Sequence, residues 1–254
     1  MPRWYETVRR AFLLDFQMPD SADQMPIGQL RNLRDIDPAR IVRQLHDAGV
    51  QALYTHAKDN QGNCYYDTHY GHKHTGIGDL DLMAEFSKEC RKVGMTILYY
   101  VQLSRERRGA LEPMYAARTH DGEPFGMKSD KALQPSEEVR PVICLNGPGR
   151  EYMKNITREL AERYDFDGYW LDCFAWWGAF AMPCYCPYCR HTFRMDTGGE
   201  LPAPDDKTSP AWRRYYLWRM KLNALVMREI TDGIRTANPN LTITHNPLYH
   251  TPAW

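Results

Sequence analysis

The sequence has no surplus of charge of either sign, because 32 lysines and arginines balance 32 aspartates and glutamates over 254 residues. Proteins that bind nucleic acid or an anionic membrane through their surface usually carry a basic excess, so the composition argues against both partners. No run approaches the ~20 apolar residues of a membrane-spanning helix. The first residues contain no apolar run ahead of a small-residue cleavage site, as a secretory signal would. We therefore expect a cytoplasmic protein.

The cysteines do not indicate a disulfide framework. There are seven, an odd number, which in a chain without a recognisable secretory signal favours thiols and metal ligands over disulfides. Internal repeats and low-complexity segments are also missing. The chain does have 43% hydrophobic residues, enough for a sizeable core, and 12% aromatic residues. Flat aromatic faces suit sugar rings, although most aromatic side chains simply pack in cores.

Short apolar stretches alternate with amphipathic helical stretches along the chain. Helix boundaries are marked by local signals, such as Asp37 before Pro38 at a start and Gly49 at an end. Strands joined by helices in this way form a parallel sheet with right-handed crossovers. The predicted strands are residues 11–16, 51–57, 95–103, 167–172 and 241–246, and the predicted helices after the first are 79–94, 150–164 and about 210–236.

The alternation predicts an α/β fold of the (β/α)₈ TIM-barrel type, with a doubly wound sheet as the alternative. A complete barrel has eight strand–helix units, and about five are recognisable here. We therefore expect residues 1–254 to be the N-terminal part of a (β/α) barrel catalytic domain, with a Cys-rich zinc loop at 173–200. The stretch 104–143 shows little periodicity and is expected to be a functional loop.

Polar residues gather where the predicted strands end, which is where parallel α/β folds place their chemistry. Asp172 follows an apolar Tyr-Trp-Leu strand and can attack an anomeric carbon to form a glycosyl–enzyme ester. Glu106 and Asp15 are the local candidates for the acid that protonates the leaving oxygen. The candidate substrate-binding residues, for which loop polarity or packing is the alternative, are Asp15, His56, Lys58, Trp176, His245 and Asn246.

A second pattern is the C-x-C-x-x-C run formed by Cys184, Cys186 and Cys189. Three thiolates at this spacing can face one ion, and a fourth ligand would complete a tetrahedral Zn²⁺ site. A closed site with four protein ligands leaves no open coordination position, so we expect a structural zinc ion. The alternative is a loop with free thiols.

Two segments resemble the alpha-L-fucosidase family of glycoside hydrolases. Residues 81–103 are similar to that family's helix and third strand, and residues 156–172 are similar to the segment ending in its nucleophilic aspartate, which falls on Asp172. The closest likeness, over most of residues 4–173, is to the hypothetical glycosyl hydrolase group related to those enzymes. The resemblance implies a retaining mechanism, with the two carboxyl groups ~5–5.5 Å apart.

A third segment, residues 55–68, resembles the family's Lys-His-His-Asp-Gly-Phe motif with its following cysteine. Asp59 and Asn60 replace the paired histidines, so fucose specificity does not follow from the likeness. Asp59, like Arg105, is expected to cap a loop or face solvent. The motif positions that align are Lys58, Gly62 and Cys64.

The cysteine pattern has a likeness of its own. Residues 144–152 resemble the Cys-containing stretch that precedes the same C-x-C-x-x-C run in beta-galactosidases carrying a trimerisation domain. This resemblance nominates Cys144 as the fourth zinc ligand, with His191 as the alternative. Those enzymes end their fourth strand with an Asn-Glu pair, where this chain has Leu171 and Asp172, so their catalytic assignment does not carry over.

The function predicted from these observations is retaining hydrolysis of an oligosaccharide or glycoside, fucosidase-like or galactosidase-like, in a protein with structural zinc. One alternative is a non-catalytic carbohydrate-binding or zinc-stabilised assembly module. Assembly of the protein into a homo-oligomer is compatible with either function. A second alternative is a metal-dependent barrel isomerase or lyase, built on His56, Asp15 and His245.

Overall fold

The computed structural model describes residues 3–15, 17, 18, 20, 33, 35–106, 109, 112–125, 142–174 and 183–245. The chain divides into two compact units that interleave along the sequence. The first, called the sheet unit below, comprises Met1–Gln102, Ile156–Asp172 and Gly233–Asn246. The second, called the cysteine unit, comprises Leu103–Asn155, Cys173–Asp232 and Pro247–Trp254.

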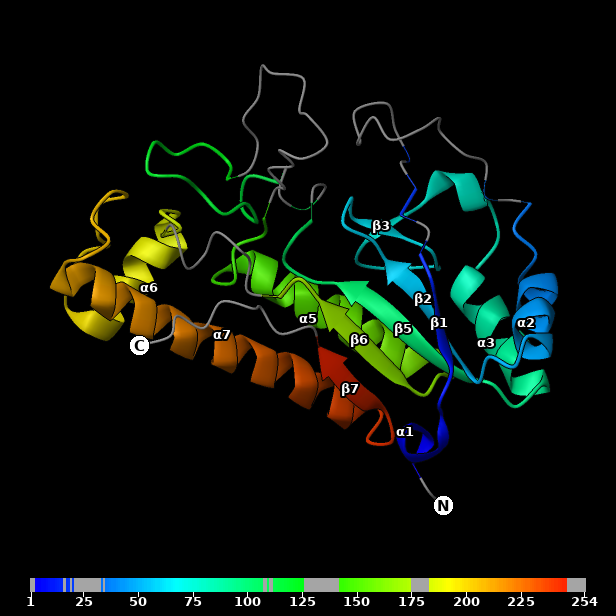
Figure 1. The fold of residues 1–254 in the computed structure, drawn as a ribbon. Helices are drawn as coiled ribbons and strands as arrows, with labels where there is room; N and C mark the ends of the chain where they lie inside the picture. Colours follow the sequence, from blue (N-terminus) through cyan, green and yellow to red (C-terminus); the bar gives the residue numbers. More distant parts are fainter. Residues whose placement is uncertain are drawn as a thin grey trace. The chain divides into compact units, whose positions relative to one another are not determined.

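The sheet unit is built on five parallel strands in the order β1-β2-β5-β6-β7 (Figure 1). Each lies within or one residue beyond a strand predicted from the sequence, so the predicted parallel α/β fold is confirmed. Two short strands, β3 (Asn63–Cys64) and β4 (His72–Lys73), extend the sheet beyond β2. The bounds of the five are β1 Ala11–Leu14, β2 Ala52–Lys58, β5 Thr96–Gln102, β6 Gly168–Asp172 and β7 Thr242–His245.

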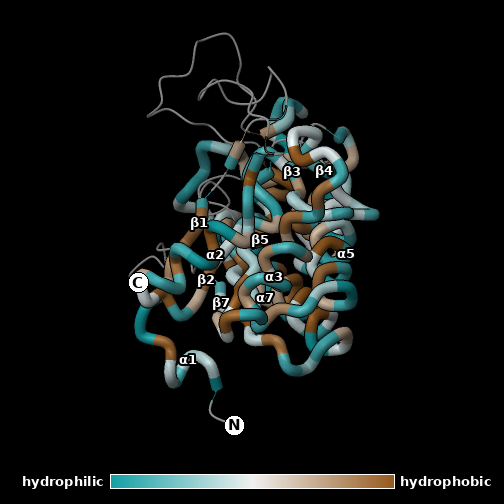
Figure 2. Tube along the Cα trace, turned by 90° about the vertical axis from the view of Figure 1, so that its right-hand side faces the viewer, coloured by the Kyte–Doolittle hydropathy of each residue, from teal (hydrophilic) through white to brown (hydrophobic). Residues whose placement is uncertain are grey.

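Helices alternate with these strands, and two of them begin at an aspartate that caps the first turn. The carboxylate of Asp37 accepts a hydrogen bond from the backbone nitrogen of Arg40 at 2.9 Å, and Asp81 caps the next long helix in the same way. Hydrophobic and hydrophilic positions alternate along α3 and α5 (Figure 2). The helices are α1 Trp4–Thr7, α2 Pro38–Asp47, η1 Thr75–Ile77 (3₁₀), α3 Leu82–Lys92, α5 Pro148–Arg163, α6 Pro187–Thr197 and α7 Pro210–Ala237.

The two faces of the sheet differ in what covers them. On the helix-covered face, the hydroxyl of Tyr99 donates to the carbonyl of Met83 in α3, and its ring stacks on Phe166 with centroids 4.1 Å apart. On the other face, the rings of Tyr54 and Trp170 touch, with centroids 5.3 Å apart, although β5 lies between their strands. Neighbouring strands lie ~4.8 Å apart, so this contact across two strand spacings indicates a concave inner face, as in a barrel wall.

The N-terminal ends of the strands are held together by a close approach and a long-range hydrogen bond. A Cβ at Gly168 would lie 2.0 Å from Oγ1 of Thr242, so only glycine allows β6 and β7 to pair here. The indole nitrogen of Trp4 donates to the same Thr242 hydroxyl at 2.8 Å. The first helix therefore reaches from β1 to the opposite edge of the described sheet.

The cysteine unit is formed by helices and loops. In its core, Phe193 of α6 packs edge-on against Trp218 of α7, with ring centroids 5.3 Å apart. Arg150 donates from Nε to a carboxylate oxygen of Glu229 at 2.7 Å. Helix α6 lies inside the stretch 173–200 for which the sequence predicted a loop and no helix. Among the described helices of the chain, none has the length and apolar character needed to cross a membrane.

Candidate functional site

Asp172 is the last residue of β6, at the carboxyl end of the parallel sheet. Its register partner on β5 is Gln102, and its side chain is 9% exposed. Tyr100, two residues earlier on β5, donates its hydroxyl proton to Oδ2 of Asp172. Because side chains alternate along a strand, Tyr100 and Gln102 share one face of β5, which is the concave inner face. The carboxylate is therefore held at the end of the sheet where barrel enzymes place their chemistry.

His56 of β2 lies beside the carboxylate of Asp15 and packs on Tyr100, the residue that binds Asp172. Its ring is 1% exposed and packs on Tyr100 with centroids 4.1 Å apart, while Nδ1 lies 3.7 Å from Oδ1 of the half-exposed Asp15. Burial lowers the pKa of His56, and the charges of Asp15 and Asp172 oppose this shift without reversing it. The imidazole is thus neutral at neutral pH and can both donate and accept a hydrogen bond. The structure brings together three of the residues predicted from the sequence.

Lys58 is the last residue of β2 and Asp59 follows it, and both side chains are buried. Nζ of Lys58 donates to the backbone carbonyl of Gln102 at 2.6 Å. The carboxylate of Asp59 accepts hydrogen bonds from the backbone nitrogens of Gln61 and Asn63 and from the hydroxyl of Tyr65. Burial raises the pKa of Asp59 to about 6 against the opposing effect of these donors. Asp59 therefore serves as a loop cap, as expected, while a substrate contact for Lys58 stays a prediction.

The other predicted site residues lie elsewhere or are not described. His245 is the exposed last residue of β7, and its register partner is Leu171. Glu106 belongs to the cysteine unit, where its buried carboxylate accepts hydrogen bonds from the backbone nitrogen of Gly109 at 2.9 Å and from the hydroxyl of Tyr152 at 3.0 Å. Trp176 and Asn246 lie outside the described residues.

Tyr100 is the one site residue of the sheet that the sequence did not single out. It lies within the apolar stretch of β5, where a tyrosine is expected to be an ordinary core residue. The available signal was its position two residues before the strand end, on the same face as Gln102.

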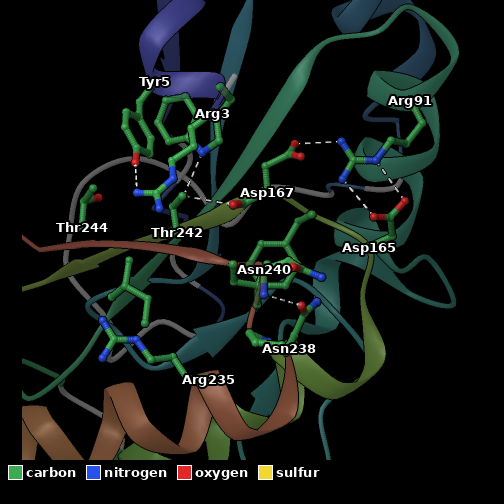
Figure 3. Close-up of a pocket in the computed structure, with 15 residues that line it drawn as sticks. Arg3, Tyr5, Arg91, Asp165, Asp167, Arg235, Asn238, Asn240, Thr242 and Thr244 are labelled. Atoms are coloured by element: carbon green, nitrogen blue, oxygen red, sulfur yellow. Dashed lines mark hydrogen bonds and ion pairs between the residues drawn. The ribbon is translucent and has the colours of Figure 1, made fainter. Parts of the chain in front are cut away.

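A hollow of about 1220 Å³ opens at the other end of the sheet unit, around the N-terminal ends of β6 and β7 (Figure 3). Within it, the guanidinium of Arg91 binds Asp165 at 2.9 Å and Asp167 at 2.8 Å. Oδ2 of Asp167 also accepts from the backbone nitrogen of Ile97. These contacts fix the segment before β6, and Asp172 lies at the opposite end of that strand. This hollow is therefore not the candidate active site.

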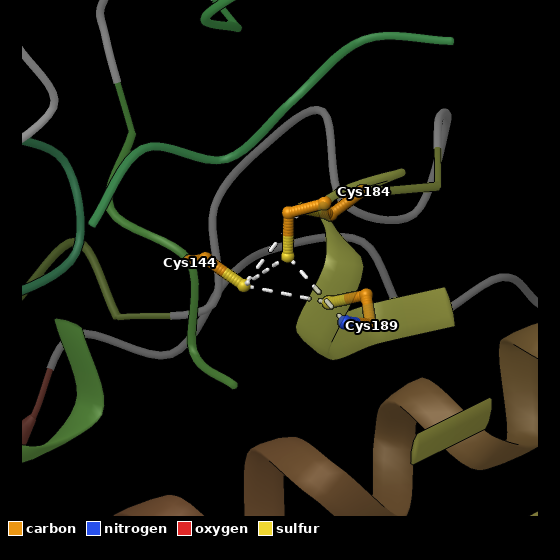
Figure 4. Close-up of side chains that lie close together, drawn as sticks. Cys144, Cys184 and Cys189 are labelled. Atoms are coloured by element: carbon orange, nitrogen blue, oxygen red, sulfur yellow. Dashed lines mark hydrogen bonds between the residues drawn. The ribbon is translucent and has the colours of Figure 1, made fainter. Parts of the chain in front are cut away.

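The cysteine unit holds four buried thiols close together (Figure 4). The Sγ atom of Cys144 lies 3.6 Å from that of Cys186, 3.4 Å from that of Cys189 and 3.7 Å from that of Cys184. Four sulfurs bound tetrahedrally to one zinc ion at ~2.3 Å would be about 3.8 Å apart. The thiols thus already have nearly the spacing that a tetrahedral ion requires, and Cys144, not His191, is the fourth member of the group.

Local structure explains how these thiols converge. Cys186 is the N-cap of α6, and its Sγ accepts from the backbone nitrogen of Cys189 in the first turn. The backbone nitrogen of Arg118 donates to Sγ of Cys184 at 3.3 Å. Coupling to the neighbouring thiols, that of Cys144 first, holds the pKa of Cys184 well below its ordinary value, and the same coupling raises the pKa values of Cys144 and Cys189. Cys184 is therefore the thiol of the cluster that most readily supplies thiolate, the form that binds a metal ion.

A family model described as "Hypothetical glycosyl hydrolase 6" matches residues 37–173, more than half of the chain. The chain belongs to this family. The match runs from the N-cap of α2 to the residue after Asp172, so it includes β2, β5, β6 and Cys144. The C-x-C-x-x-C run lies beyond it. No curated protein matches this member of the hypothetical glycosyl hydrolases.

Solved structures show which fold this family member has. Alpha-L-fucosidase isoenzyme 2 from Paenibacillus thiaminolyticus superposes with a TM-score of 0.72 at 20% identity, covering 96% of this chain and 32% of that protein. The PgaB (BpsB) glycoside hydrolase domain from Bordetella bronchiseptica superposes with a TM-score of 0.63 at 10% identity, covering 94% and 65%. The chain thus spans about a third of the length of the fucosidase and about two thirds of the length of the PgaB domain. Both likenesses show the barrel-type fold.

Proposed function

We propose that this chain carries the nucleophile of a retaining glycoside hydrolase, and that the nucleophile is Asp172. The observation that carries the proposal is the placement of this carboxylate at the carboxyl end of β6, bound by the hydroxyl of Tyr100. Membership of a glycosyl hydrolase family implies a carbohydrate substrate. Fucosidase-like and galactosidase-like glycosides are the first substrates to test, and the chain supplies five strand–helix units of the barrel catalytic domain.

The proposed reaction has two steps. An oxygen of Asp172 attacks the anomeric carbon while a second carboxylic acid protonates the departing glycosidic oxygen, and water then hydrolyses the glycosyl ester. Tyr100 orients the carboxylate through Oδ2. His56, neutral and beside both Asp15 and Asp172, is placed to bind a sugar hydroxyl. Asp15, in the same unit as Asp172, is our candidate for the acid.

The decisive experiment traps the intermediate. The full-length protein is incubated with 2-deoxy-2-fluoro glycosides of fucose and galactose that carry a good leaving group, then digested and analysed by mass spectrometry. We expect a glycosyl adduct on the peptide containing Asp172. Replacing this residue, Asp172→Asn, should reduce kcat/KM for aryl glycosides by ~10³-fold or more, because the covalent step is removed.

The matched control is Asp205→Asn, an aspartate of the other unit that is not placed at the sheet end. It should leave turnover unchanged. An adduct on another carboxylate, or full activity of Asp172→Asn, would refute the assignment. A wild-type protein that binds glycans but cleaves no glycoside of the panel would favour the non-catalytic binding module.

We also propose that the four thiols bind one structural Zn²⁺. The support is their burial and near-tetrahedral spacing, and a closed four-thiolate shell leaves no position for substrate. Freshly purified protein should contain one zinc ion per chain by elemental analysis. Protein that folds fully without any bound metal would contradict this part of the proposal.

A further inference from the structure

Arg219 is a charged residue buried in the core of the cysteine unit. It lies on α7 between Tyr215 and Leu222, on the helix face that also buries those two residues, and it is 3% exposed. Among the described residues, its Nε and Nη1 atoms have no hydrogen-bond partner. A guanidinium group does not lose its proton in proteins. Burial of a cation whose donors are not all paired is unfavourable, so this position calls for a compensating negative charge.

The groups whose charges act on Arg219 identify the source of that compensation. Burial works to lower the pKa of Arg219, while Tyr215 and the thiols Cys189, Cys144 and Cys184 raise it and give a net increase. Tyr215 is itself buried, and burial raises its pKa, so its phenol is neutral at neutral pH. Cys189 and Phe193 are buried one turn apart on α6, and Phe193 contacts the rings of Tyr215 and Trp218, so the face of α6 that carries a cluster thiol packs against the stretch of α7 that buries Arg219. Thiolates bound to a metal ion would therefore place negative charge near Arg219. Contact between α6 and α7 through Phe193 and Trp218 holds the two helices in this arrangement.

Counting charges distinguishes the states that the cluster can adopt. Four thiolates around a divalent ion carry a net charge of −2, and Arg219 reduces the total to −1. Four neutral thiols, or two disulfides, carry no charge and cannot compensate the positive charge of Arg219. The surroundings of the cluster thus fit a dianionic metal centre better than a metal-free or oxidised one.

We propose that Arg219 is the buried counter-ion of a dianionic four-thiolate metal centre formed by Cys144, Cys184, Cys186 and Cys189, and that its charge determines how tightly the centre holds a divalent ion. This inference rests on the proposed zinc site and adds a residue from outside the ligand set. It also gives α7 a role beyond packing, because loss of the ion would leave a charge of this helix buried without compensation.

The test compares variants of the full chain that keep or remove the charge. Zinc affinity is measured at fixed pH by competition with a chromophoric chelator for wild type, Arg219→Lys and Arg219→Met. The matched control is Arg228→Met, which removes an exposed arginine of the same helix. Cobalt(II) substitution reports on the ligands, because four thiolates give intense sulfur-to-cobalt charge-transfer absorption. Unchanged absorption in every variant would show that the ligand set is intact.

We expect Arg219→Met to weaken zinc binding on the order of tenfold to a hundredfold, as a unit charge near the centre predicts in a protein interior. Arg219→Lys should recover most of the affinity, and Arg228→Met should match wild type. If wild type binds neither zinc nor cobalt, the proposed metal site itself fails. If wild type binds zinc and Arg219→Met binds it equally well, the counter-ion role fails while the site stands. Should Arg219→Met not fold, Arg219→Gln replaces it, and equal affinities of the Gln and Lys variants would overturn the inference.

Discussion

The sheet unit and the cysteine unit are held together in different ways. The sheet unit buries side chains such as Leu53, Ile97 and Tyr169 completely between parallel strands and the helices on one face, so its stability is spread over a large apolar area. The cysteine unit has helices, a small aromatic core and four converging thiols. The comparison teaches that one chain can combine stability spread over many apolar contacts with stability that depends on a single cluster of four thiols. The two should respond differently to the same perturbation.

Removing the zinc ion that we propose for the four thiols should give the largest effect and confine it to the cysteine unit. Zinc binding to small domains is worth about 10–16 kcal/mol, which exceeds the stability of most domains. We therefore expect a strong chelator, or Cys186→Ser, to abolish hydrogen-exchange protection of α6. Strands β5 and β6 should stay protected. Equal loss of protection in α6 and in these strands would show that the units are not energetically separate.

Truncating a core side chain of the sheet unit should destabilise that unit and leave the cysteine unit unaffected. Ile97 is completely buried on β5, and Ile97→Ala should lower the free energy of unfolding by about 2–5 kcal/mol through lost burial and a cavity. Zinc content should not change. Leu217→Ala, which truncates an exposed leucine of α7, is the control and should cost little. Denaturant titration with metal analysis of the same samples would check both results.

Acidity should affect the sheet unit through Asp59. Its pKa in the folded state is about 6, above the ordinary 3.8, so the folded state holds the proton more tightly than the unfolded state. The resulting stability is fully present below about pH 4 and is lost as the pH rises through 6, with a total of about 3 kcal/mol. Asp59→Asn should lack this slope. Parallel pH dependences of wild type and variant would contradict the prediction.

The smallest effect is expected at the surface of the sheet unit. Arg91 binds Asp165 and Asp167 in partly exposed positions, where solvent weakens ion pairs. Arg91→Ala should lower the free energy of unfolding by roughly 1 kcal/mol, and less in high salt. A loss that is larger and insensitive to salt would mean that the hollow around Arg91 has a greater structural role than its exposure suggests.

Much of the fold followed from local signals in the sequence. The five parallel strands, the helix capped by Asp37 and the helix expected at 79–94 were predictable because apolar periodicity and capping chemistry act within a few residues. Helix α6 was not, because its N-cap is Cys186, a residue that reads as a metal ligand rather than as a helix start. The C-x-C-x-x-C pattern indicates only that Cys186 could bind a metal ion and does not indicate that it also caps a helix.

The candidate site was predictable to a similar degree. Asp172, His56 and Asp15 converge because the carboxyl ends of parallel strands share one edge. Tyr100 was missed because a tyrosine within an apolar strand has no local mark of its function. The inward turn of Lys58 onto a backbone carbonyl likewise depends on a neighbouring strand, which no local pattern describes.

The interleaving of the two units has a consequence for synthesis on the ribosome. The chain enters the cysteine unit at Leu103, returns at Ile156, leaves again at Cys173 and returns at Gly233. All four thiols are therefore translated before β7. If the four thiols bind zinc as proposed, a nascent chain can capture the ion while the sheet still lacks its last described strand. The supply of metal during translation would then influence the order in which the polypeptide assembles, as well as the stability of the finished product.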